Sequence, residues 1–147
     1  MCGIAGFIHS DPARPADPAV LERMNAAQNY RGPDDAGIWH RGPVGLAHRR
    51  LSILDPTPAG HQPMVSADGQ RVVVFNGEIY NFRAIRSELM ERGSVFRTQC
   101  DTEVLLEAHR VWGDEALDRF NGMFAYALYD LARERLLLVR DRLGIKP

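Results

Sequence analysis

The sequence predicts an α+β fold in which sheets and helices form separate layers. The predicted strands and helices come in blocks along the chain rather than in strict alternation, which argues against a doubly wound parallel sheet. The run Val72-Val73-Val74-Phe75 is apolar at consecutive positions, as in a strand that is covered on both faces. A sheet built from such strands needs a further layer on each side, so we expect a layered sandwich.

The N-terminal third is predicted to hold short strands around one helix. Residues 3–8 are mostly apolar and lack a helical period, which favours a strand. Asp17 and Pro18 supply an N-cap and a first-turn proline for a helix over residues 18–29. Three short apolar stretches, separated by Gly and Pro, predict strands at residues 37–39, 44–48 and 51–54.

A loop and a hairpin follow. Residues 56–63 hold three prolines and a glycine, which predict a loop. Asp68-Gly69 tolerates the positive φ of a tight hairpin turn. We therefore expect this dipeptide to join strands at residues 64–67 and 70–75.

Two helices and two more strands complete the chain. Asn81 can cap a helix that ends at Gly93, and Asp101 can cap a second helix that ends at Gly113. Apolar residues recur at helical spacing within both segments. The remaining elements are a short turn and two buried strands, at residues 114–119, 123–129 and 136–139.

Composition excludes several classes of function. The chain has 147 residues, of which 45% are hydrophobic, and this length and composition indicate one globular domain. A net charge of −1 lacks the basic excess of a nucleic-acid binder. No apolar run approaches the roughly 20 residues of a membrane span. The N-terminus has no basic secretory signal and two cysteines cannot form a disulfide framework, so we expect a cytoplasmic protein.

Cys2 is the first candidate for a catalytic residue. Methionine before a small side chain is commonly removed, which would leave Cys2 with a free α-amine. Amines of this kind and thiols both exchange protons near neutral pH, so one residue can supply base and nucleophile together. The alternative is that Cys2 is a small apolar filler at the start of a strand.

Seven short segments stand in register along the whole chain. They are MCGIAGF at 1–7, RGPD at 31–34, AHRRLSILD at 47–55, NGEIYN at 76–81, CDTE at 100–103, NGMFA at 121–125 and RDRLGIKP at 140–147. Together they closely resemble the glutaminase domain of asparagine synthetases, a class II glutamine amidotransferase of the N-terminal-nucleophile hydrolase type. Each segment is weak evidence alone, and the ordered set is specific.

The resemblance implies a four-layer αββα sandwich, truncated at its C-terminus. Residues 1–147 would then form an incomplete class II glutamine amidotransferase domain, with the ATP-dependent synthetase domain absent. The implied reaction is hydrolysis of glutamine to glutamate and ammonia through a thioester on Cys2. In the full-length enzyme the ammonia would serve the synthesis of asparagine from aspartate. ATP and Mg are implied for the absent domain, and no cofactor for this chain.

The resemblance also assigns roles to six residues. The tetrahedral intermediate formed after attack by Cys2 would be stabilised by the Asn76 side chain and the Gly77 backbone N–H. Arg50 would bind the α-carboxylate of glutamine, because a guanidinium can bind a carboxylate through two hydrogen bonds. Asp101, with Glu78 close by, would bind the α-ammonium group. The alternatives are a turn at Asn76-Gly77, a solvated charge at Arg50 and a helix N-cap at Asp101.

Residues close to these are expected to be structural. Arg49 would face away from Arg50 on a strand. His48 and the segment 31–34 are assigned to folding, the segment as a turn whose charges pair locally. Cys100 is expected to be a buried free thiol, with a place near the pocket as the alternative. The five histidines show no metal-ligand spacing, so no metal site is expected.

The expected partners are glutamine and the missing synthetase domain, without nucleic acid or membrane, and a homodimer stays open. Two other functions also stay open. The chain can be the ammonia-donating domain of a different amide ligase of the same plan. It can also be a catalytically silent fragment that acts as an interaction module.

Overall fold

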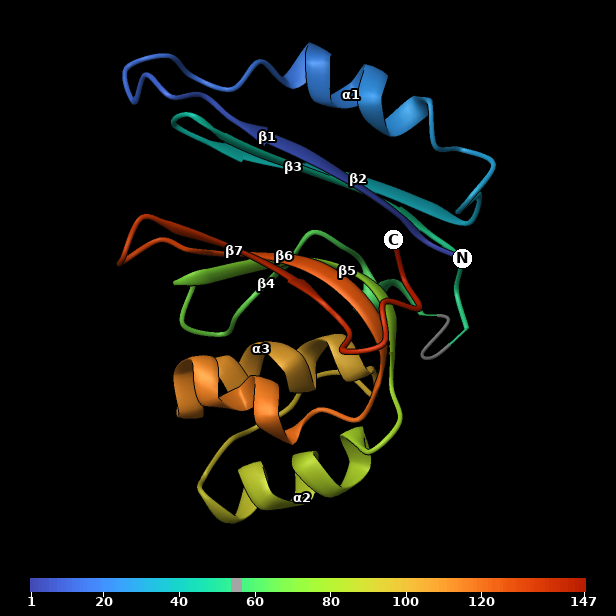
Figure 1. Ribbon diagram of the computed structural model, residues 1–147, viewed down its shortest axis with the longest axis vertical. Helices are drawn as coiled ribbons and strands as arrows, with labels where there is room; N and C mark the ends of the chain where they lie inside the picture. Colours follow the sequence, from blue (N-terminus) through green and yellow to red (C-terminus); the bar gives the residue numbers. More distant parts are fainter. Residues whose placement is uncertain (54–56) are drawn as a thin grey trace.

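The computed structural model describes residues 1–53 and 57–147 and has four layers (Figure 1). Helix α1 (Pro18–Ala26) covers a first sheet, this sheet packs on a second one, and helices α3 (Asp101–Trp112) and α2 (Phe82–Glu91) cover the far face of the second sheet. The expected αββα sandwich is therefore confirmed.

The first sheet has three antiparallel strands in the order β1-β3-β2. They are β1 (Gly3–Ile8), β2 (Asp35–Arg41) and β3 (Val44–Arg50). The Asp17 carboxylate accepts a hydrogen bond of 2.8 Å from the Ala19 amide, which confirms the predicted N-cap of α1. Leu21 of this helix is fully buried against the sheet.

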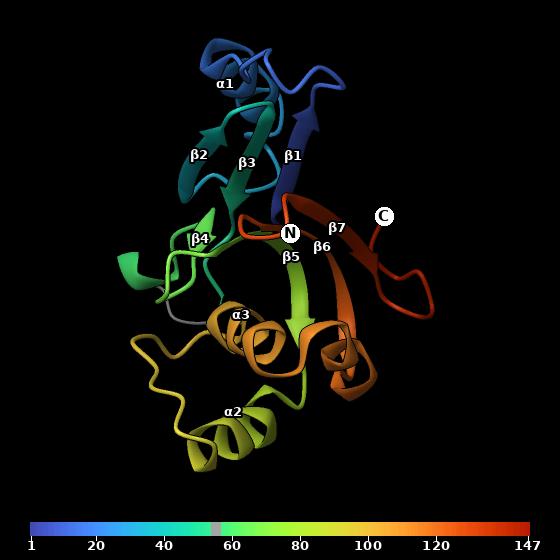
Figure 2. The same ribbon diagram turned by 90° about the vertical axis from the view of Figure 1, so that its left-hand side faces the viewer.

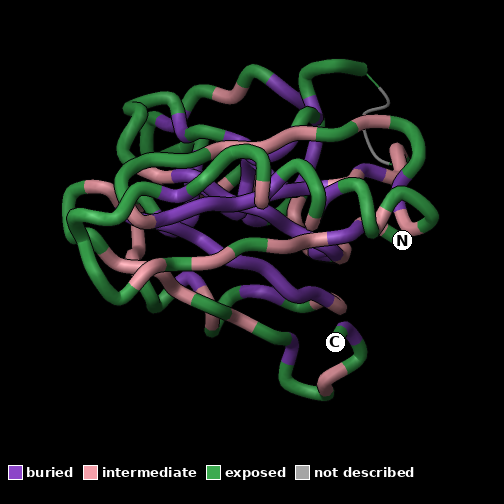
Figure 3. The backbone as a smooth tube through the Cα atoms, turned by 90° about the horizontal axis from the view of Figure 1, so that it is seen from above, coloured by how far each residue is buried: buried purple, intermediate pink, exposed green. Residues whose placement is uncertain are grey.

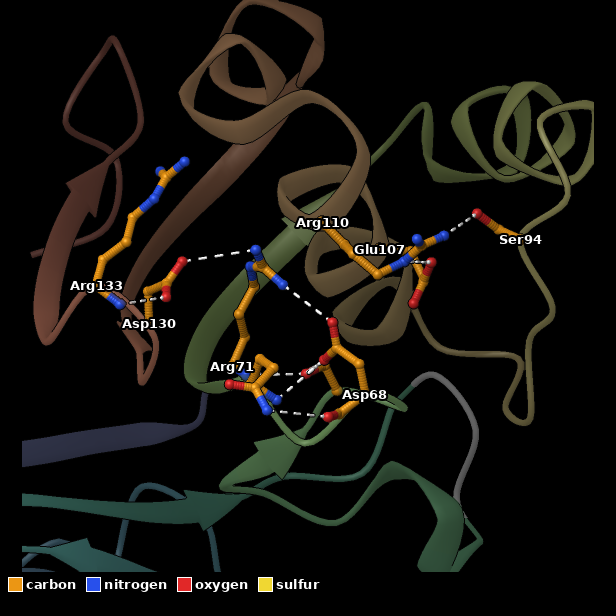
Figure 4. A network of polar contacts seen from close by, with 9 residues as sticks. Asp68, Arg71, Ser94, Glu107, Arg110, Asp130 and Arg133 are labelled. Carbon is orange, nitrogen blue, oxygen red and sulfur yellow. Dashed lines mark hydrogen bonds and ion pairs between the residues drawn. The ribbon is translucent and has the colours of Figure 1, made fainter.

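The second sheet has four antiparallel strands in the order β4-β5-β6-β7. They are β4 (Met64–Val65), β5 (Arg71–Ile79), β6 (Gly122–Asp130) and β7 (Arg135–Arg140). The predicted Asp68-Gly69 hairpin turn is confirmed, with Gly69 at a φ of 69°. Arg71 lies between Asp68 of this turn and Asp130 at the end of β6, and forms ion pairs with both (Figure 4).

The consecutive apolar residues of β5 pack into two hydrophobic cores, one on each face of the strand. Val72 and Val74 point toward the first sheet and cluster with Val44. Val73 and Phe75 point the other way and cluster with the apolar residues of α3 and α2. The expectation of a strand covered on both faces is confirmed, and the buried residues run through the middle of the molecule (Figure 3).

The two long helices of the second half lie one behind the other on the second sheet. Helix α3 contacts β5, and α2 packs on α3 (Figure 2). Glycines end both helices as predicted, with Gly93 at φ 90° and Gly113 at φ 61°. Short 3-10 helices span Pro58–Gly60 and Gly113–Arg119. No helix among the described residues is both long and apolar enough to span a membrane.

Several local expectations are wrong. Helix α1 ends at Ala26 rather than at residue 29, because turns follow as far as Arg31. Residues 51–53 of the strand expected at 51–54 have no regular structure, and Leu54 lies outside the described residues, as does Pro56 of the predicted loop. A short apolar run bounded by Gly or Pro is therefore not sufficient to predict a strand in this segment.

The two caps expected in the second half are only partly correct, because Asn81 is the N-cap residue of α2 but its side chain makes no cap hydrogen bond. Asn81 holds the chain before β6 instead, donating to the Arg119 carbonyl at 2.9 Å and accepting from the Asn121 amide at 3.0 Å. Asp101 is the first residue of α3, and Cys100 occupies the cap position without a side-chain cap bond. The Asn81 side chain thus bonds only to distant backbone groups, and the Asp101 carboxylate accepts from the distant Ile79 amide in addition to amides of its own first turn.

The predicted local pairing within residues 31–34 is wrong as well. Arg31 Nε donates to the Cys2 carbonyl at 3.1 Å, and Asp34 accepts from the Ser52 amide at 2.8 Å. These two charges therefore join the start of β1 and the chain after β3 to the turn that follows α1.

Two histidines are buried as neutral groups between the layers. His109 of α3 forms a hydrogen bond of 2.8 Å with the Tyr126 hydroxyl of β6. His48, expected to be structural, forms one of 3.0 Å with the Phe75 carbonyl. Burial lowers the pKa of each imidazole to about 4.

We expect His109 to make the fold acid-sensitive. Since the unfolded chain protonates His109 near its ordinary pKa and the folded chain only near a pKa of about 4, acid favours the unfolded state below about pH 6.5. Between pH 7 and pH 5 this one residue should remove about 2 kcal/mol of unfolding free energy. Because His48 causes a similar loss in both proteins, the loss measured by urea denaturation between these pH values should be about 2 kcal/mol smaller in His109→Gln than in wild type. An equal loss in both proteins would contradict the assignment.

Candidate active site

A cavity of about 120 Å³ opens at one end of the sandwich. It lies where β1 begins, where β3 ends and beside the N-terminus of α3, and both chain termini are at this end (Figure 1). Six residues that the sequence singles out line this one cavity: Cys2, Arg50, Asn76, Gly77, Glu78 and Asp101. Residues far apart in the chain are thus brought together.

Cys2 is held by the first sheet. Gly3 pairs with Arg49, so Cys2 continues the antiparallel ladder beside the end of β3. Its Sγ accepts from the Leu51 amide at 3.4 Å and lies 3.7 Å from the Leu51 carbonyl oxygen. With Arg31 bound to its carbonyl, the residue is fixed at the cavity wall and its side chain is only partly buried.

The edge of β5 supplies a backbone donor to the cavity. Strand β4 begins only at Met64, opposite Val73, so β5 has no strand neighbour on that side beyond this point. Alternate amides of β5 face the open edge. The Phe75 amide donates to Gln62 Oε1 at 2.7 Å, and the Ile79 amide donates to Asp101 Oδ2 at 3.0 Å. The Gly77 amide between them makes no hydrogen bond within the described residues.

Glycine is required at position 77 by close packing of two strands. A Cβ there would lie 2.2 Å from the Met123 carbonyl oxygen and 2.6 Å from Phe124 Cα. The neighbouring Asn76 side chain is buried and makes no hydrogen bond to the described residues. Both residues line the cavity, so these two neighbouring donors indicate a place for a ligand oxygen.

Arg50 presents a guanidinium to the cavity from the end of β3. It is buried, and its Nη1 donates to the Thr57 carbonyl at 2.9 Å. Gly60 packs so closely that a Cβ there would lie 2.0 Å from Nη2. Arg49 points to the opposite face and donates to the Asn25 carbonyl at 3.1 Å, which confirms the expected alternation.

Asp101 is a buried carboxyl group with no basic side chain bonded to it among the described residues. Burial, with a smaller contribution from nearby Glu78, raises its pKa to about 6, although the amides of Ile79, Asp101 and Thr102 oppose the rise. An ionised carboxylate in such a place is stabilised by a cation. The cavity therefore combines a guanidinium, two carboxylates, two neutral donors and a thiol, which suits a zwitterionic amino acid with a reactive carbonyl.

Sequence reasoning missed several residues that line the cavity, among them Gly60, Gln62 and Lys146. Gln62 and Gly60 lie in the loop before β4, where no periodic pattern marks them. Lys146 is buried, and its Nζ donates to Met1 Sδ at 3.1 Å. Cys100 is a buried thiol and also lines the cavity, so both of its expected placements hold. Among the described residues, no group of three or more His, Cys, Asp or Glu could hold a metal.

Comparisons with known proteins give a consistent result. Residues 1–147 match the family described as "Glutamine amidotransferase domain". The chain is 38% identical over 149 residues to asparagine synthetase [glutamine-hydrolyzing] 3 of Bacillus subtilis and 41% identical over 149 residues to asparagine synthetase B [glutamine-hydrolyzing] of Escherichia coli. All of this chain is covered, but only 24% and 26% of those proteins. The chain thus spans about a quarter of the length of these relatives.

A solved structure shares the fold. Glutamine phosphoribosylpyrophosphate amidotransferase from B. subtilis superimposes with a TM-score of 0.61 at 22% identity. The match covers 74% of this chain and 25% of that chain. At this identity the likeness concerns the arrangement of strands and helices.

We expect Asp101→Asn to stabilise the protein at neutral pH. Because the folded state raises the pKa of Asp101 from 3.8 to about 6, its ionised form destabilises the fold above about pH 6, and this cost disappears as the pH falls toward 3.8. Urea denaturation at pH 8 should show a gain of up to about 3 kcal/mol, which shrinks toward pH 4. Asp118→Asn, an exposed carboxyl, should change stability little at either pH. A loss of stability in Asp101→Asn at pH 8 would contradict this account.

Proposed function

Since the chain belongs to the glutamine amidotransferase domain family, we propose that residues 1–147 act as a class II glutaminase unit. Glutamine is hydrolysed to glutamate and ammonia, with Cys2 as the nucleophile. The observation that supports this most directly is one cavity that holds the Cys2 thiol together with two donors, from Asn76 and Gly77, that make no hydrogen bond within the described residues.

The chemistry needs the α-amine of Cys2, so removal of Met1 comes first. The thiol proton passes to this amine as sulfur attacks the side-chain carbonyl carbon of glutamine. The carbonyl oxygen becomes an oxyanion, which the Asn76 side chain and the Gly77 N–H stabilise by roughly 3 kcal/mol each. The protonated amine then gives its proton to the departing ammonia, and water hydrolyses the remaining thioester to glutamate.

Substrate recognition rests on complementary charge. Arg50 binds the α-carboxylate through its guanidinium, and Asp101 with Glu78 binds the α-ammonium group. The raised pKa of Asp101 supports this role, because an ammonium group supplies the cation that the buried carboxylate lacks. Binding of the zwitterion thus removes an unfavourable charge as well as adding contacts.

The released ammonia has a use in longer proteins. The curated relatives are named glutamine-hydrolyzing asparagine synthetases. We infer that the present unit supplies ammonia to an ATP-dependent synthetase domain that converts aspartate to asparagine. ATP and Mg would bind to that domain and have no role at the cavity described above.

We expect Cys2→Ala to abolish glutaminase activity, because the proposed thioester forms on the Cys2 sulfur. Glutamate release from glutamine should fall below detection, with the circular dichroism spectrum unchanged. Cys100→Ala, which removes the other thiol of the cavity, should retain activity within a few-fold. Intact mass should show that active wild type lacks Met1. Full activity in Cys2→Ala, or in protein that keeps Met1, would contradict the mechanism.

We expect Arg50→Ala to weaken glutamine binding. Loss of a buried charged hydrogen-bonding partner should raise the KM for glutamine by about 30-fold or more, with a much smaller change in kcat. Arg49→Ala is the matched control, because this neighbour faces α1 and should leave KM nearly unchanged. Steady-state kinetics of both variants make the comparison. A lower kcat with an unchanged KM in Arg50→Ala would contradict the proposal that Arg50 binds the α-carboxylate of glutamine.

A further inference from the structure

Gln62 joins two walls of the cavity through its side-chain amide. The residue is buried, and it lies in the loop just before β4. Its Oε1 accepts from the Phe75 amide of β5 at 2.7 Å. Its Nε2 donates to the Thr102 hydroxyl of α3 at 3.4 Å. One side chain thus links the strand and the helix that carry the proposed oxyanion donors and the proposed ammonium partner.

The bond to Phe75 substitutes for a missing strand. Because β4 begins at Met64, the Phe75 amide would otherwise be buried without a partner at the edge of β5. The Phe75 carbonyl at the same position accepts from His48 Nε2 at 3.0 Å. Both backbone polar groups of Phe75 are therefore held by side chains of other segments.

The position of Phe75 makes this bond relevant to catalysis. The next residue is Asn76, and the next amide along the same edge belongs to Gly77. A rotation of the strand at Phe75 would redirect both donors, and oxyanion stabilisation depends on donors that are already aligned with the developing charge. A displacement of about 1 Å can lower a rate by about a hundredfold.

We propose that Gln62 is a positioning residue that aligns Asn76 and Gly77 through the Phe75 amide. This inference rests on the proposed glutaminase function. It assigns Gln62 an effect on kcat rather than on ligand affinity, because its strong bond is to the strand that bears the donors. Gln62 itself contacts no reacting atom in this assignment.

Three variants of the full chain test the proposal. Gln62→Met keeps the size of the side chain and removes both hydrogen bonds. Gln62→Glu keeps an acceptor oxygen for the Phe75 amide, and the Thr102 hydroxyl can turn to donate to it. Ser66→Ala is the matched control, because Ser66 Oγ accepts from the Arg71 amide at 2.9 Å on the same edge of β5, at the end away from the cavity.

The kinetic result should separate these variants. Gln62→Met should lower kcat for glutamine hydrolysis about tenfold or more and change KM less than about threefold. The kcat of Gln62→Glu should lie within about threefold of the wild-type value. Any further difference between Gln62→Glu and wild type should be in KM. Ser66→Ala should keep kcat. A kcat unchanged in Gln62→Met, or lowered equally in Ser66→Ala, would overturn the proposal.

Alkylation of Cys2 gives a second readout. In the reaction with iodoacetamide the Cys2 sulfur displaces iodide, a C–S bond replaces a C–I bond, and no oxyanion forms. Gln62→Met should therefore alkylate Cys2 at the wild-type rate, as measured on the N-terminal peptide by mass spectrometry. An alkylation rate that falls in parallel with kcat would overturn the positioning role. An inactive wild type with normal alkylation would instead refute the proposed function itself.

Discussion

The structure of the cavity depends on the unpaired edge of one strand. Strand β5 has a partner on both sides only as far as Val73, and beyond that point its outward amides must find acceptors elsewhere. Side chains from two other segments, Gln62 and Asp101, accept from Phe75 and Ile79. The Gly77 amide between them makes no hydrogen bond within the described residues, and the proposed function gives this amide to the oxyanion. An incomplete strand ladder thus leaves a backbone donor that faces the cavity.

The same edge explains why charge can be buried here. The Ile79 amide stabilises the Asp101 carboxylate, yet burial still raises the pKa of this group. Arg50 is enclosed in a similar way, between the Thr57 carbonyl and the backbone of Gly60. The fold thus holds two opposite charges in one small cavity, each attached to rigid strands or to the first turn of a helix. Such charges select a zwitterion more strongly than exposed ones would.

The local pattern of apolar and turn-forming residues was sufficient to predict most strands and helices of the fold. Contacts between distant segments determine the features that this pattern does not predict. Short apolar runs identified β1, β3 and β5, apolar residues at helical spacing identified both long helices, and the ordered motifs identified six of the residues that line the cavity. Asn81 is the predicted N-cap residue of α2, but its side chain bonds to distant backbone groups instead of to the helix, and Asp101 lies one residue inside α3, where its carboxylate also accepts from the distant Ile79 amide. Gln62 and Gly60 could not be predicted, since their importance comes from Phe75 and Arg50, which only the folded chain brings near.

The meeting of both chain ends at the cavity has a practical consequence. Met1 and Lys146 both line it, and their side chains touch. An affinity tag or fusion partner at the N-terminus would block the amine that the proposed chemistry needs and would lie beside the cavity. Fluorescent labels and surface immobilisation are better attached to the exposed connection between β1 and α1, which lies at the opposite end of the sandwich (Figure 1).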